Sequence, residues 1–144
     1  MTTNADRADI LARSLQAGVA GDRTTIEAVY TDDVKAWSPA FSVSSLSELL
    51  GEFDLRDDAF SDFDVEVIPL DVGGDYACAE WRVSMTHSGE LTLDDRDVVG
   101  PTGVRVTLHG ITVAEFRERR ICSFRQYWDE LSVFEQLGVP QDEG

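Results

Sequence analysis

Residues 125–138, RQYWDELSVFEQLG, place a carboxylate, Asp129, directly after the aromatic residues Tyr127 and Trp128. A carboxyl group in an apolar, aromatic setting can take a proton from a substrate and return it later in the reaction. An aspartate just before an amphipathic run also commonly caps the helix that follows. The sequence therefore offers two roles for Asp129, a proton carrier and a helix cap, and leaves both open.

Two histidines and an arginine could assist such a carboxylate. His87 ends an apolar run beside Gly89, where it either lines the mouth of a pocket or has a structural role. His109 comes opposite Asp129 only if the last hairpin holds one extra residue, because a slip of one residue reverses the facing of a strand. Arg125 would either stabilise an enolate or pair with surface acids.

Aromatic side chains supply candidate walls for an apolar pocket. Trp37, near Pro39, and Tyr127, near Asp129, could both contact a substrate. Trp81 fits either a pocket wall or the core, because it lies on the apolar face of a predicted strand. The histidines and cysteines are too far apart in the sequence to indicate a metal site. The sequence contains neither a glycine-rich phosphate loop nor a serine in a nucleophile elbow.

The chain is strongly acidic, with a formal net charge of −16 at pH 7 and a pI of about 4.2. Nucleic acids and anionic membrane surfaces attract cationic proteins, so neither is expected as a partner. The acidic residues are spread along the chain, and Lys35 is the only lysine. This pattern indicates either a solvated acidic surface or an adaptation to a salty cytoplasm, where dense carboxylates keep a protein soluble.

Length and composition predict one domain that covers residues 1–144. The longest apolar runs are the size of strands and fall short of a membrane span. The first residues lack the basic and apolar regions of a signal peptide, so a cytoplasmic location is expected. Cys78 and Cys122 each lie in an apolar run, and buried free thiols are favoured over a single bridge.

The first part of the chain has the spacing of helices. Apolar residues recur at helical intervals in residues 4–20, and Asp22 opens a second short helix. Residues 34–39 are typical of a brief strand that a proline stops. Ser45 and Glu48 form a capping-box pair, which predicts a third helix.

After residue 60 the apolar period changes to two, which is typical of strands. Strands are predicted at residues 63–70, 76–89, 104–116 and 121–131, with a loop at 91–103 and a closing helical turn. Helices followed by long antiparallel strands predict an α+β domain, in which N-terminal helices pack on one face of a curved antiparallel or mixed sheet. Such a sheet forms a cone that can hold an apolar ligand.

Four segments carry a family resemblance: AGDRTTIEAVYTDDV (20–34), MTHSGEL (85–91), GPTGVRVTLHGITV (100–113) and YWDELSVFEQLG (127–138). Together they resemble the SnoaL-like polyketide cyclases of the nuclear-transport-factor-2-like superfamily, over residues 15–139. The resemblance implies the cone-shaped α+β fold, a hydrophobic small-molecule ligand and chemistry without a cofactor. The superfamily hosts several activities on one scaffold, so the resemblance leaves the reaction open.

The family's cyclases close a ring on a polyketide ester by an intramolecular aldol reaction, and the resemblance places their general acid/base on Asp129. If Glu118 and Arg119 form the last turn, Thr112 faces Arg125. The family's helper histidine would then fall near Thr112, where this chain has none, and Thr112 becomes a candidate for substrate contact.

Three classes of function follow. The first is a cyclase-type enzyme acting on an apolar, carbonyl-rich small molecule. The second is another cofactor-free isomerase, dehydratase or epoxide hydrolase in the same pocket, and the third is a non-catalytic binding module. Both faces of residues 104–128 carry large apolar groups while helices can cover only one, so a homodimer through the outer sheet face is expected.

Overall fold

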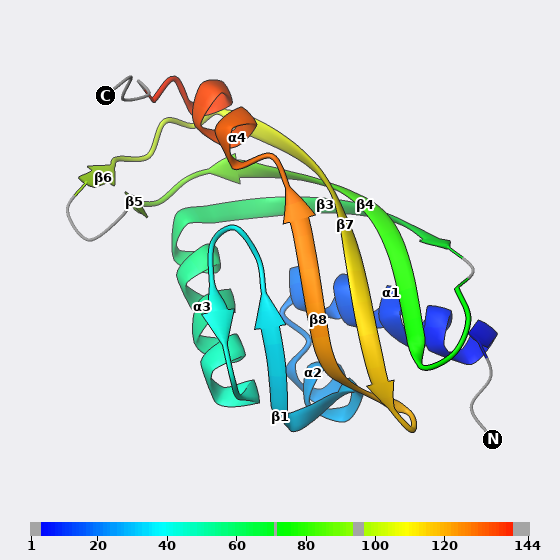
Figure 1. The fold of residues 1–144 in the computed structure, drawn as a ribbon. Coiled ribbons are helices and arrows are strands. Elements are labelled where there is room, and N and C mark those ends of the chain that lie inside the picture. The colour runs from blue at the N-terminus through cyan, green and yellow to red at the C-terminus, as the bar shows by residue number, and fades with distance from the viewer. Residues whose placement is uncertain (1–3, 71, 94–96, 140–144) are drawn as a thin grey trace, which may run out of the picture.

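A curved mixed sheet and the helices on its concave face form the body of the protein in a computed structural model, which describes residues 4–70, 72–93 and 97–139 (Figure 1). The elements are α1 (Asn4–Ala20), α2 (Arg23–Val29), β1 (Tyr30–Trp37), β2 (Ser42–Val43), α3 (Leu46–Ala59), β3 (Phe60–Leu70), β4 (Tyr76–His87), β5 (Leu91–Leu93), β6 (Asp97–Val99), β7 (Arg105–Arg117), β8 (Arg120–Trp128) and α4 (Glu130–Leu137). The main sheet has the order β2-β1-β8-β7-β4-β3. β1 runs parallel to β8 and the other neighbours run antiparallel. The predicted α+β class is confirmed.

Local capping signals set the helix starts, as the sequence predicted. The N–H of Thr25 donates to Oδ1 of Asp22 at 3.2 Å, which caps α2. The bonds from Thr25 also hold the pKa of Asp22 below its usual value. The N–H of Glu48 donates to Oγ of Ser45 at 3.1 Å, which caps α3. Each cap satisfies an N–H group that would otherwise lack a partner in the helix.

The core lies between the concave sheet face and the first three helices. α1 packs across β3 and β4, and α3 lies against β1 (Figure 1). The most deeply buried apolar side chains, each at most 1% exposed, include Leu11, Ile26, Val34, Leu49 and Ile121. Burying one side chain of this kind typically stabilises a fold by about 1.5–3 kcal/mol. Within the described ranges, no helix is long and apolar enough to cross a bilayer.

The last hairpin turns where predicted, but its register differs. Arg117 pairs with Arg120 across the turn, and Glu118 takes the left-handed conformation with φ 59°. The register then shifts by one residue at Cys122, which forms a bulge on β8. The pairing of Thr112 with Arg125 is therefore wrong, and the alternative register with one extra residue is the one observed. The extra residue stands in β8 and not in the turn, and His109 comes into register with Asp129 just beyond the last pair.

Because of the bulge, Thr112 pairs with Gln126 and Gly110 pairs with Trp128. The side chains of Phe124, Gln126 and Trp128 consequently face the concave side, where α1 and α3 lie. Arg125 and Tyr127, which alternate with them, face the convex side.

Other segments also differ from the prediction. The strand predicted at 34–39 spans Tyr30–Trp37 instead. Residues 91–103, predicted as a loop, contain β5 and β6, which pair Leu91 with Val99 in a small separate sheet. The β-branched residues of this segment favour strands despite the polar residues between them. The strand predicted at 121–131 ends at Trp128, because the following residues start α4. Cys78 and Cys122 are free thiols, as predicted, but only Cys78 is buried and Cys122 is half-buried.

Candidate active site

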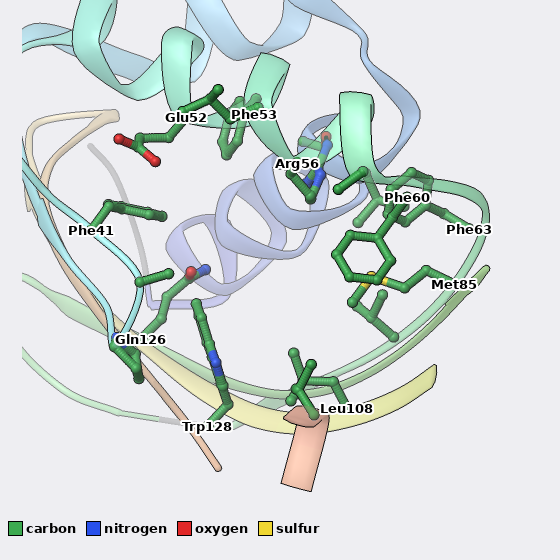
Figure 2. A pocket seen from close by; sticks show the side chains of 18 of the residues that line it. Phe41, Glu52, Phe53, Arg56, Phe60, Phe63, Met85, Leu108, Gln126 and Trp128 are labelled. Carbon is green, nitrogen blue, oxygen red and sulfur yellow. Dashed lines mark hydrogen bonds between the residues drawn. The ribbon is translucent and has the colours of Figure 1, made fainter. Parts of the chain in front are cut away.

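A large cavity opens between the concave sheet face, α1, α3 and α4. Its volume is about 1420 Å³, which exceeds the size of typical pockets for drug-like ligands. Its walls are mainly aromatic and aliphatic, and they include Phe41, Phe53, Phe60, Phe63, Met85 and Leu108 (Figure 2). An apolar wall of this composition suits a hydrophobic ligand with several rings or a long carbon chain.

A hydrogen-bond network behind one wall fixes the orientation of two cavity residues. The Nε1–H of Trp81 donates to Oγ1 of Thr112 at 2.9 Å, and Nε2 of Gln126 donates to the same oxygen at 3.2 Å. Thr112 is 1% exposed, so this network is shielded from solvent. The amide nitrogen of Gln126 is held by Thr112, and its side-chain carbonyl oxygen has no partner among the described residues, which leaves it for a cavity ligand.

Gly110 makes room for this arrangement. A Cβ atom at residue 110 would overlap the ring of Trp81 and lie 2.8 Å from the carbonyl oxygen of Tyr127. The Trp81 ring can therefore cross the strand at Gly110 and meet the edge of Trp128, with ring centroids 6.1 Å apart.

Four carboxylates of the described residues line the cavity. Asp58 and Glu90 are exposed at its edge, whereas Glu52 and Glu130 are half-buried. Glu52 projects from α3 into the cavity, on the side where Phe41 and Gln126 lie (Figure 2). Within the described ranges, Glu52 has no hydrogen bond or ion pair, so its carboxylate is available to a ligand.

Among the residues that the structure describes, one cation, Arg56, lines the cavity, one helical turn beyond Glu52. Its Nη2 donates to the carbonyl oxygen of Gly18 at 2.6 Å and to Oδ1 of Asp57 at 2.9 Å. Its guanidinium also lies 5.2 Å from the ring centre of Phe53 and 4.9 Å from that of Phe63. These contacts hold the guanidinium in place against the wall.

Asp129 lies outside this cavity. Its side chain is exposed and accepts a hydrogen bond from the N–H of Ser132 at 3.2 Å, which caps α4. The helix cap, one of the two roles left open by the sequence, is therefore present. The apolar, enclosed setting predicted for this carboxylate is not, because the bulge at Cys122 turns the aromatic residue before it inward instead.

Several other predicted site residues lie on the convex face. Trp37 and Tyr127 are each 44% exposed and contact one another, with ring centroids 5.3 Å apart. Arg125 and His109 are also exposed on this side. These four residues therefore lie across the sheet from the cavity. Of the predicted substrate residues, Trp81 belongs to the cavity wall, and Thr112 lies behind it and bonds to Trp81.

His87 is buried beside the cavity and has a structural setting. Its Nδ1 lies 2.9 Å from Oγ1 of Thr102 and its ring packs on Phe60 at 5.4 Å. The N–H of Thr102 also donates to Nδ1 at 3.3 Å. These contacts hold the segment that leads into β7 against the end of β4.

The sequence reasoning missed Glu52, Arg56 and Gln126. A signal for the first two was present, since Leu49, Glu52, Phe53 and Arg56 follow the spacing of one helix face. A charged pair on the apolar face of a predicted helix points to a cavity or a buried ion pair. Gln126 had no comparable signal, because its facing depends on the bulge.

Comparisons with known proteins agree with this architecture. The model of the SnoaL-like domain family matches residues 11–124. AclR of Streptomyces galilaeus, a candidate hydroxylase, superposes with a TM-score of 0.80 at 22% identity, over 99% of this chain and 87% of that one. IdmH of Streptomyces antibioticus, a candidate polyketide cyclase, superposes with a TM-score of 0.76 at 22% identity, over 92% of this chain and 99% of that one.

A third neighbour has a different chemistry. An epoxide hydrolase of M. tuberculosis, similar to LEH, superposes with a TM-score of 0.70 at 17% identity, over 92% of this chain and 90% of that one. No curated protein matches the sequence. At these identities the neighbours show the fold and not the reaction. The family match covers most of the chain, and the protein is therefore a member of the SnoaL-like domain family.

Proposed function

We propose that this protein is a cofactor-free enzyme of the polyketide cyclase type. It binds an apolar, carbonyl-rich small molecule in the cavity and closes a ring by an intramolecular aldol reaction. The observation that carries this proposal is the half-buried Glu52 carboxylate, which has no partner in the described residues and projects into an aromatic-walled cavity. A carboxylate placed in this way can take and return a proton.

The reaction needs one group that moves a proton twice. The Glu52 carboxylate takes a proton from a substrate carbon that lies between two carbonyl groups, and the electron pair of the C–H bond moves into one carbonyl as an enolate. The enolate carbon attacks a second carbonyl of the same substrate and forms the C–C bond. The alkoxide produced takes the proton back from Glu52, so no oxidant, reductant or other reactant is consumed.

The cavity walls supply the geometry of the ring closure. Trp81 and Trp128 offer flat apolar surfaces for a folded carbon chain, and the network through Thr112 holds Trp81 in one orientation. Bringing two ends of one substrate together in this way removes much of the entropic barrier to ring closure. The side-chain carbonyl oxygen of Gln126 can accept a hydrogen bond from a substrate hydroxyl and so fix the position of the substrate along the cavity.

Asp129 is the acid that the family resemblance implies, and its catalytic role stays a prediction. Asp129 is the exposed cap of α4, whereas Glu52 projects into the cavity, so the structure supports Glu52 more strongly than Asp129 as the proton carrier. The two candidates can be separated by replacing each carboxylate with its amide, which keeps the shape and removes the proton transfer.

The test compares Glu52→Gln with Asp129→Asn in an assay with a methyl-ester polyketide or another activated carbonyl substrate. We expect Glu52→Gln to lower kcat by about a hundredfold to ten-thousandfold, the usual loss when general acid/base help is removed. Asp129→Asn should keep both activity and melting temperature, because asparagine caps a helix nearly as well as aspartate. Wild-type turnover by Glu52→Gln would contradict the assignment of Glu52, and a large loss in Asp129→Asn would return the role to Asp129.

The same assay separates the alternative functions. Isomerisation, dehydration or epoxide opening would appear as turnover of a different substrate class with the same dependence on a cavity carboxylate. A non-catalytic binding module would bind apolar ligands in the cavity and turn over none of them.

We also propose that the protein acts as a homodimer through the convex sheet face. This face carries the exposed side chains of Trp37, Tyr127 and Ile68, and the helices cover only the opposite side (Figure 1). Apolar groups gathered on one sheet face favour burial against a partner.

A further inference from the structure

The guanidinium of Arg56 is held by several contacts, but some of its N–H donors have no partner within the described residues. An arginine carries five N–H donors: one on Nε and two on each terminal nitrogen. Nε donates to Oδ1 of Asp57 at 3.2 Å, and Nη2 donates to the carbonyl oxygen of Gly18 and to Asp57. Both N–H groups of Nη1 lack a partner within the described residues.

Arg56 belongs to the cavity wall, where unused donors can bind a ligand. Its side chain lines the cavity and is only 26% exposed, so the unused donors are partly shielded from water. The rings of Phe53 and Phe63 lie 5.2 and 4.9 Å from the guanidinium and limit its movement. A fixed, partly desolvated guanidinium binds oxygen anions more strongly than a mobile surface arginine does.

We propose that Arg56 forms an oxygen-anion subsite in the cavity, which binds an enolate, phenolate or carboxylate oxygen on an aromatic or aliphatic skeleton. Asp57 already offsets part of the charge of Arg56, so the subsite favours an oxygen whose negative charge is delocalised or develops during the reaction. It is a specificity-determining feature, because it requires the ligand to carry such an oxygen near the end of α3.

The spacing from Glu52 narrows the substrate class, a step that rests on the proposed function. Residues four apart on a helix lie on one face, separated by about 6 Å along the axis. A substrate whose acidic carbon reaches Glu52 would therefore present the oxygen of a neighbouring carbonyl toward Arg56. This arrangement fits a β-dicarbonyl group, in which the enolate oxygen formed by proton removal is stabilised by the Arg56 donors.

A pair of fluorescent dyes tests the subsite without any turnover. 8-Anilinonaphthalene-1-sulfonate and N-phenyl-1-naphthylamine share one skeleton, and only the first carries an anionic oxygen group. We expect Arg56→Gln to weaken binding of the sulfonate dye by about ten- to a hundredfold, the size of a charged hydrogen bond. Binding of the neutral dye should stay within about twofold, which shows that the cavity is intact.

Three more variants sharpen the comparison. Arg23→Gln removes the same charge at an exposed site on α2, where Arg23 pairs with Asp54. It should change the binding of neither dye. Asp57→Asn removes the charge that offsets Arg56 and should tighten sulfonate binding. Arg56→Lys keeps the charge but not the planar fork of donors, and should fall between Arg56→Gln and the wild type.

The outcomes decide the proposal in either direction. A parallel loss of both dyes in Arg56→Gln would assign Arg56 a purely structural role and overturn the subsite. Equal losses in Arg56→Gln and Arg23→Gln, or a wild type that does not bind the sulfonate dye, would also overturn it. Glu52→Gln separates this inference from the proposed function: loss of turnover with intact sulfonate binding supports both, whereas full turnover with Arg56-dependent dye binding leaves only the subsite standing.

Discussion

Tyr30 is a buried ionisable residue at the back of the cavity. It is 4% exposed, and burial raises its pKa to about 12, although a hydrogen bond with Ser14 opposes part of that effect. In the unfolded chain a tyrosine ionises near pH 10. The unfolded state therefore releases its proton first, and the folded state loses relative stability as pH rises from about 10 to 12.

The expected size of this effect at pH 11 is about 1.4 kcal/mol of unfolding free energy, from the two pKa values and the linkage relation. Tyr30→Phe removes it, so the variant should lose less stability than the wild type between pH 9 and pH 11. Urea titrations at both pH values measure the difference. Tyr76→Phe, at an exposed position, is the matched control and should behave as the wild type does. Identical losses in the wild type and Tyr30→Phe would contradict the prediction.

At the same scale, the sequence offered the helix cap as one of two roles for Asp129, and the structure shows that cap, but the surroundings of Asp129 were predicted wrongly. A cap depends on four consecutive residues, and the spacing of Asp129 to Ser132 is visible in the printed sequence. Whether a neighbouring aromatic ring faces a cavity depends on the pairing of a whole strand, which local sequence does not determine.

Among the strands, the packing of the Trp81 ring of β4 across β7 depends on one small residue, Gly110. Gly110→Ala places a methyl group against the ring of Trp81 and close to the Tyr127 carbonyl oxygen. We expect it to displace Trp81, break its bond to Thr112 and lower stability by about 1–3 kcal/mol, a usual result of overpacking. Thermal and urea unfolding measure the change.

The same substitution in α3 should act in the opposite direction. An added Cβ at Gly51 meets no atom within 4 Å, and the residue lies inside the helix. Gly51→Ala should therefore stabilise the protein by about 0.5–1 kcal/mol, because alanine is the better helix former. If both alanine variants destabilised the protein equally, the clash at Trp81 would not be the cause.

Most elements were predictable because their signals are local. Caps at Asp22 and Ser45 and the alternation of β4 and β7 all appear within a few residues of sequence. The pair β5–β6 and the shift at Cys122 were not predictable in this way, because each depends on partners that the fold brings together. The side chains of β8 that line the cavity were missed because of the shift at Cys122.

For the whole molecule, the convex face carries the prediction of a homodimer. Light scattering at micromolar concentration should give twice the chain mass of 15.9 kDa. Trp37→Lys puts a charge at the centre of the aromatic pair with Tyr127 and should shift the protein toward the monomer. Val98→Lys, at an exposed apolar residue on β6, should leave the mass unchanged. A wild-type monomer would refute the dimer, and the cavity assignments would be unaffected.

The bulge at Cys122 has a consequence for how chains of this fold can change length. In the described hairpin Cys122 stands between the pair of Phe116 with Ile121 and the pair of Glu115 with Ser123. A gene that lost this codon would keep every other pair, so Gln126 would still face the cavity. Loss of a codon further along β8 would instead exchange the two faces beyond it. Gaps between related sequences should therefore gather at this point, and a gap placed elsewhere would misassign the residues that line the pocket.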